Sequence, residues 1–189
     1  PRVGLVLQAV ADDYQYVNSP NLDSEGRAYL VGARIDGDLL NGEVSVGQFE
    51  PDYADPTIGT FDGLAVPAAL EWYITRLTTI TLSGRQDADD QISVSVGEPY
   101  IVTEFGMRVD HELLRNLILT AAVLGGERED ESIDRHDEYA EFVLGADYLL
   151  NPHAAVRFRY DYHESDSSGA VPGRDFEENA LTLGLSLRL

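Results

Sequence analysis

The chain has 189 residues, with 34 acidic side chains against 13 basic ones and a formal net charge of −21. All the basic residues are arginines, and the chain contains neither lysine nor cysteine. We expect no nucleic-acid partner, because binding to phosphates needs a basic face. The lack of cysteine excludes disulfides, thiolate metal sites and a cysteine nucleophile. The length suits one domain, so residues 1–189 are expected to form a single one.

Alternation of apolar and polar residues along the chain predicts β-strands. It is less clean in the first and third strands and clearest in the last, where Leu181, Leu183, Leu185, Leu187 and Leu189 alternate with polar or small residues. No apolar run approaches the roughly 20 residues of a membrane helix. In chain order, we expect ten strands, around residues 3–16, 29–35, 41–52, 70–75, 79–85, 101–110, 117–123, 140–148, 156–163 and 181–189.

The connections between these strands alternate in length. Short turns are expected near residues 37–38, 75–76, 111–115 and 151–152, and long connections near 17–26, 52–65, 86–91, 127–137 and 164–177. Such a rhythm is typical of an up-and-down antiparallel meander, with the long loops at one end of the sheet.

The polar side of the strands carries charges of both signs, which suits either the wet exterior of a soluble barrel or the enclosed lumen of a membrane barrel. Long strands, acidic long loops, and aromatic residues near strand ends, such as Trp72, Tyr73, Tyr148, Tyr160 and Tyr162, favour the membrane. We therefore predict an all-β, transmembrane up-and-down barrel that contacts bacterial outer-membrane lipid. The charged residues predicted to line its lumen are Arg34, Glu71, Arg85, Glu104, Arg108, Glu141, Asp147, Arg157, Arg159, Asp161 and Arg188.

Two resemblances support this prediction. Thr182, Gly184, Leu187 and Leu189 resemble the carboxy-terminal signal of outer-membrane barrels, which implies the barrel-assembly machinery as a partner. The stretches 70–75, 109–117 and 148–151 resemble the putative β-barrel porin type 2 family. Members of that family are usually longer, so the resemblance implies the carboxy-terminal part of a larger barrel. It also implies a porin-like channel or scaffold, often encoded near polysaccharide-export genes.

The lumen arginines have two interpretations. They either pair with Glu71, Glu104, Glu141 and Asp161 to hold the wall, which we favour, or form a basic ladder for an anionic solute or polysaccharide.

Other polar residues leave two alternative functions open. Asp161 and His163 are the best candidates for a hydrolase at the rim, although we expect no enzyme. The acidic loop 127–138, with His136, is expected to be solvated, but could bind divalent cations and serve a structural or adhesive barrel. His111 and His153 are interpreted as turn residues. No other cofactor or metal is expected.

Overall fold

The computed structural model describes residues 2–15, 23–53, 63–89, 100–130 and 134–187. These residues form one antiparallel sheet, and the all-β prediction is confirmed. No helix among them is long and apolar enough to cross a membrane. The strands are β1 (Arg2–Tyr14), β2 (Ser24–Asp36), β3 (Leu40–Tyr53), β4 (Gly63–Ala65), β5 (Ala68–Thr75), β6 (Thr78–Asp89), β7 (Tyr100–Leu114), β8 (Leu117–Asp130), β9 (Arg135–Asn151), β10 (Ala154–Gly169) and β11 (Phe176–Leu187).

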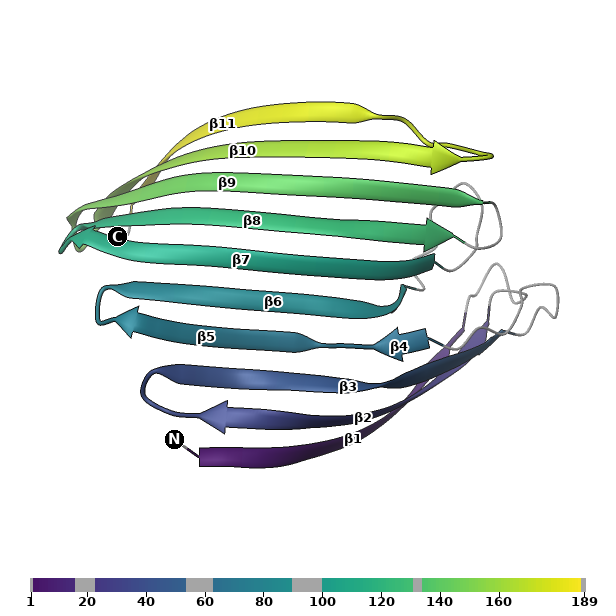
Figure 1. The fold of residues 1–189 in the computed structure, drawn as a ribbon. Helices are drawn as coiled ribbons and strands as arrows, with labels where there is room; N and C mark the ends of the chain where they lie inside the picture. The colour runs from purple at the N-terminus through teal and green to yellow at the C-terminus, as the bar shows by residue number, and fades with distance from the viewer. Residues whose placement is uncertain (1, 16–22, 54–62, 90–99, 131–133, 188–189) are drawn as a thin grey trace.

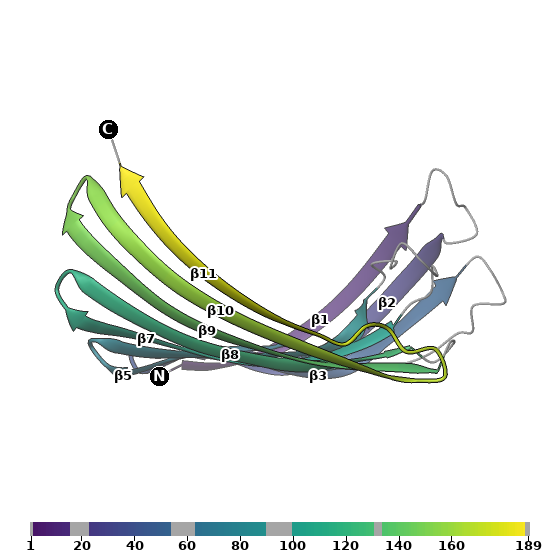
Figure 2. The same ribbon diagram turned by 90° about the horizontal axis from the view of Figure 1, so that it is seen from above.

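Each strand pairs with its neighbour in the chain, as in an up-and-down meander, except that β4 and β5 both pair with β3 (Figure 1). Seen from above, the sheet is strongly curved, and β1 and β11 form its two edges (Figure 2). Both the first and the last strand are therefore open to further pairing in this structure. In lipid such edges must be paired, because nothing there replaces the missing backbone hydrogen bonds.

The structure has one strand more than the ten predicted, because Pro67 interrupts a strand. β4 pairs with β3 through Gly47↔Ala65, and β5 continues the same pairing from Val44↔Ala68. Proline has no N–H to donate to a neighbouring strand. Its carbonyl still accepts a hydrogen bond from the Ser45 amide at 3.0 Å, so the interruption is local.

Several strands are longer than the sequence pattern indicates. β8 reaches Asp130, β9 begins at Arg135 and β10 reaches Gly169, all within stretches predicted to be loops. β7 also continues to Leu114, so the prediction of a turn over residues 111–115 is wrong. The turn lies at residues 115–116. His111 is therefore a strand residue, and its Nδ1 lies 2.9 Å from the Thr78 hydroxyl. Backbone pairing sustains these extensions after the apolar alternation has ended.

The convex face carries an uncharged belt. Cross-strand pairing places every second residue of each strand on this face, and from Ala140 to Tyr148 in β9 or Leu181 to Leu187 in β11 those residues are apolar. Leu5 and Leu183 leave 75% and 76% of their surface exposed. The belt is close to the 9–11 residues that a tilted strand needs to cross a bilayer.

The belt ends in acidic residues at the end of the sheet that carries the long connections. They face outward and lie close together in the pairing register, since Glu127 is opposite Glu138 and Glu164 is opposite Glu177. Trp72, Tyr148, Tyr160 and Tyr162 share the convex face, as expected for interface aromatics. Tyr73, which was grouped with them, instead lies on the opposite face and donates a hydrogen bond to Glu71 at 2.7 Å.

Candidate functional site

The ten described residues among the predicted lumen charges all lie on one face of the sheet. The pairings Arg34↔Glu43, Arg85↔Glu104 and Arg157↔Asp147 fix this face from β2 to β10. The eleventh, Arg188, lies outside the described residues.

This charged face is the concave one. Burial locates it, because a curved sheet crowds the side chains on its inner side. The buried side chains of Ser45, Phe49, Val102 and Tyr139 all belong to the charged face. The large side chains of the belt, by contrast, are broadly exposed on the other face. We use "inner face" below for this charged, concave side of β1–β11.

Ion pairs cover the inner face as a ladder. Nitrogen–oxygen distances are 2.7 Å for Arg34–Glu43, 2.6 Å for Arg108–Asp110 and 2.6 Å for both Arg157–Asp147 and Arg159–Asp161. Arg85 also pairs with Glu104. The geometry favours the structural interpretation of these arginines, in which each holds a carboxylate of its own or the next strand. Guiding an anionic solute stays an untested prediction.

The partners differ in part from those expected. Glu104 and Asp161 hold arginines as predicted, but Glu71 bonds to Tyr73, and Glu141 lies 3.1 Å from His163 Nδ1. Three other carboxylates, Glu43, Asp110 and Asp147, bind the remaining arginines of the ladder. Two signals could have identified the first two: Glu43 faces Arg34 across the hairpin turn at residues 37–38, and Asp110 follows Arg108 by two positions on one strand.

Close packing at a glycine joins three strands of the inner face. Tyr139 of β9 crosses Gly126 of β8, where an added Cβ would lie 2.6 Å from the tyrosine hydroxyl oxygen. The tyrosine hydroxyl thereby reaches Glu104 on β7 and donates a hydrogen bond to it. The Arg128 guanidinium lies 4.7 Å from the centre of the Tyr139 ring. Only the absence of a side chain at Gly126 allows this arrangement.

A shallow cavity of about 360 Å³ lies on the inner face of β9–β11. Glu141, His163 and Glu178 occupy one row across its floor, and the His163 ring stacks on Phe176 with 5.0 Å between ring centres. Asp161 also lines the cavity, but its carboxylate bonds to Arg159. The proposed hydrolytic pair is thus not assembled here, because Glu141, and not Asp161, contacts the imidazole.

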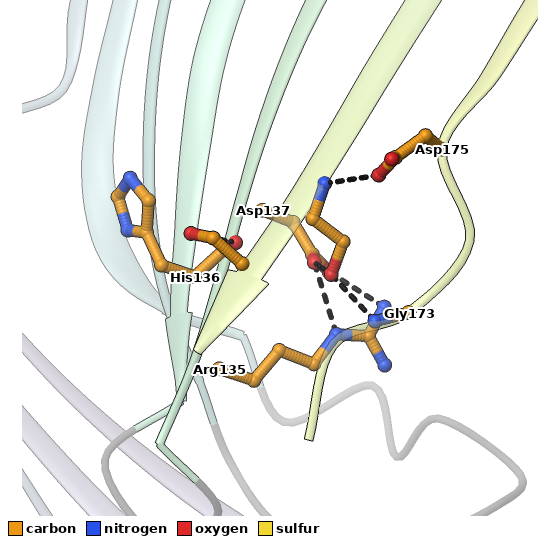
Figure 3. Close-up of polar contacts among 7 residues, drawn as sticks. Arg135, His136, Asp137, Gly173 and Asp175 are labelled. Carbon is orange, nitrogen blue, oxygen red and sulfur yellow. Dashed lines mark hydrogen bonds and ion pairs between the residues drawn. The ribbon is translucent and has the colours of Figure 1, made fainter. Parts of the chain in front are cut away.

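The connection from β10 to β11 folds back over the end of the inner face (Figure 3). Asp175 accepts a hydrogen bond from the Ser167 amide at 2.8 Å, and the Gly173 amide donates to the Ser167 hydroxyl at 2.6 Å. That hydroxyl donates to Asp137, which also binds Arg135 at 2.7 Å. We call this set, Arg135, Asp137, Ser167, Gly173 and Asp175, the rim latch. No sequence pattern predicts this set of contacts.

Glycine is required where the latch begins. Gly169 has a φ of 112°, and an added Cβ would lie 2.0 Å from the Asp134 carbonyl oxygen. The Ala170 amide donates to that same carbonyl at 2.8 Å. A side chain at this position would therefore separate the connection from the start of β9.

Asp137 lies beyond the belt, since its neighbour Glu138 faces outward opposite Glu127. Burial by itself would raise the pKa of this carboxyl group. Hydrogen bonds from Arg135 and Ser167 outweigh burial and lower the pKa below its usual value. The ionised form therefore stabilises the rim latch.

The acidic loop 127–138, which is expected to be solvated and for which cation binding is the alternative, lies only partly within the described residues, which exclude 131–133. Within the described part, His136 Nε2 lies 3.4 Å from Glu138 and 4.0 Å from Glu127 on the convex side. No group of three or more potential metal ligands is assembled among the residues that the structure describes. Cation binding by this loop stays the untested alternative. His153 lies in the turn after Asn151, as predicted, with its amide bonded to the Asn151 side chain at 2.8 Å.

Comparison with known families matches this architecture. The family model described as Putative beta-barrel porin 2 matches residues 7–189, nearly the whole chain. The chain belongs to this family. No curated protein matches the chain. Membership of a β-barrel porin family agrees with the curved antiparallel sheet, its uncharged convex belt and its charged inner face. It also confirms the family predicted from stretches 70–75, 109–117 and 148–151.

Proposed function

We propose that the chain forms the wall of a porin-like channel in the bacterial outer membrane, with the convex belt in lipid and the inner face toward water. The observation that carries this proposal is the separation of side chains by face. In every described strand, the outward positions of the belt hold no arginine, aspartate or glutamate. The inner face, by contrast, holds ion pairs in the same rows of the pairing register.

Physical chemistry supports this orientation. A charged side chain facing lipid near the middle of a membrane barrel costs about 2–4 kcal/mol, whereas lumen positions tolerate charge. The reverse arrangement, a soluble barrel, would need the leucines of β11 to pack inside a concave core. Leu181, Leu183 and Leu185 instead lie on the convex face and are exposed. The long connections would then face outside and the short turns the periplasm.

Swelling of liposomes tests the channel directly. Vesicles that contain the folded protein should swell in isosmotic neutral sugars up to a limiting size, because neutral solutes report passage independently of charge. A heat-modifiability gel provides the control for folding. If vesicles with folded protein fail to swell with any sugar, the channel proposal is wrong, and a non-transporting barrel is favoured.

The same experiment addresses the narrower role in polysaccharide export. A channel for a polymer should admit oligosaccharides well beyond the size of a disaccharide, whereas a small-solute porin should exclude them. Association with export machinery follows only from the family resemblance, so it needs this independent support.

A further inference from the structure

The inner face has more carboxylates than its arginines neutralise. The five arginines of the ladder each bond to a carboxylate, as described above. An arginine held in this way contributes little net field to the space beyond its partner, because the two charges cancel at distances longer than their separation. The electrostatic character of the wall then depends on the carboxylates that remain.

Among these carboxylates, Glu71, Glu141 and Glu178 have no arginine within ion-pair distance among the described residues. Glu71 accepts its hydrogen bond from a tyrosine hydroxyl, and Glu141 lies beside the His163 ring. Glu178 is opposite His163 on the other side, in β11. A phenol carries no compensating charge, and a single imidazole can balance at most one of the two carboxylates that flank it.

Two of these carboxylates are close together and open to the interior. Glu141 and Glu178 flank His163 in one row and line the same cavity of about 360 Å³. Glu178 is exposed, and Glu141 is half-buried. A mobile ion that passes this part of the wall therefore encounters negative charge at the cavity and, on β5, at Glu71.

We propose that this wall makes the channel selective for small cations, and that Glu71, Glu141 and Glu178 set the preference. The inference rests on the proposed channel function and adds its substrate class. Carboxylates that line a pore attract cations and repel anions of the same size. The preference should weaken in concentrated salt, because the screening length falls from about 10 Å at 0.1 M to about 3 Å at 1 M.

Reversal potentials in planar lipid bilayers test the proposal on the full chain. In a KCl gradient at low ionic strength, K⁺ should permeate several-fold more readily than Cl⁻, and the ratio should move toward one in 1 M KCl. The variants Glu141→Gln and Glu178→Gln should each lower the ratio, the double variant more than either alone, and Glu71→Gln by a smaller amount.

Glu177 provides a matched control. It precedes Glu178 in the same strand but faces outward, opposite Glu164. Glu177→Gln removes the same charge and should leave the ratio unchanged, whereas Arg157→Gln, which frees Asp147 on the inner face, should raise it.

The outcomes separate the two proposals. Conductance with equal or greater permeability to Cl⁻ overturns cation selectivity alone. Conductance with a K⁺ preference that none of the three glutamine variants alters overturns the assignment to these residues. Absence of any conductance from folded protein overturns the channel function and this inference together. If a variant fails the heat-modifiability gel, the wild-type ratio and its salt dependence still decide for or against selectivity.

Discussion

The first three strands and the last five have the same outer face but different inner faces. On the outside, Leu5 and Val31 belong to the same uncharged belt as Leu144 and Leu183. On the inside, β1–β3 carry mainly glycine and apolar side chains with the Arg34–Glu43 pair, whereas β7–β11 carry linked ion pairs and the rim latch. In the proposed orientation, lipid imposes one rule on every strand, while the interior is free to vary with function.

Charge introduced into the belt should have the largest effect, and the same effect in both regions. Val31→Arg in β2 and Leu144→Arg in β9 should each cost about 2–4 kcal/mol of unfolding free energy, because an arginine must then face lipid. The adjacent change Val143→Arg faces inward and should cost less than about 1 kcal/mol. Urea unfolding in lipid vesicles measures all three. Equal costs at residues 143 and 144 would contradict the assignment of faces.

Packing on the inner face should be the next most sensitive feature, and in the second region Gly126 tests it. Gly126→Ala must displace Tyr139 from Glu104, so we expect a loss of about 1–3 kcal/mol. Gly125→Ala is the matched control, since the nearest atom to its added Cβ lies 3.9 Å away. The same unfolding assay should show little change for it. Comparable losses for both variants would mean that the tyrosine contact is unimportant.

Ion pairs should matter more where they are linked. Arg108→Ala leaves Asp110 with only Thr120, which donates to it at 2.6 Å, and should cost about 1 kcal/mol. Arg34→Ala removes a pair whose arginine is more exposed and should cost about 0.5 kcal/mol or less. Urea midpoints at fixed salt distinguish the two. A larger loss from Arg34→Ala would reverse the comparison between the regions.

Acid should release the rim latch without unfolding the sheet, which is the smallest effect we predict. The pKa of Asp137 is lowered in the folded protein, so its contribution is complete above the ordinary aspartate pKa and is lost as pH falls through the lowered value. Exchange of the Gly173 amide, corrected for intrinsic rates, should therefore be protected at neutral pH and lose protection in acid below about pH 4.

Asp137→Asn serves as the control for this prediction. It should give the unprotected state of the Gly173 amide already at neutral pH, with little further change in acid. Protection that persists in the variant would show that Asp137 does not hold the latch.

The sequence predicted the features that follow from period-two alternation. The shared face of Arg34, Glu141 and Arg159 required only strand parity, and the antiparallel order followed from the alternating lengths of the connections. The family was predicted from the resemblance of stretches 70–75, 109–117 and 148–151. Strand ends could not be predicted in this way, because Asp130 and Gly169 lie in polar stretches where backbone pairing, and not alternation, maintains the strand.

Partner choice on the inner face was predicted only in part. Parity places Asp161 and His163 on one face of β10, but only the register with β9 shows that Glu141 contacts the histidine, while Arg159 of β10 binds the aspartate. The rim latch depends on how residues 170–175 fold back, for which Gly169 was the available signal.

Single cysteines test the central claim most directly, since the protein has none of its own. Thr182→Cys and Leu183→Cys are adjacent in β11 and lie on opposite faces. In lipid vesicles, a water-soluble maleimide should label the cysteine at 182 and leave that at 183 unlabelled until the protein is denatured. Labelling of 183 with 182 protected, or equal labelling of both, would contradict an outer face in lipid and an inner face in water.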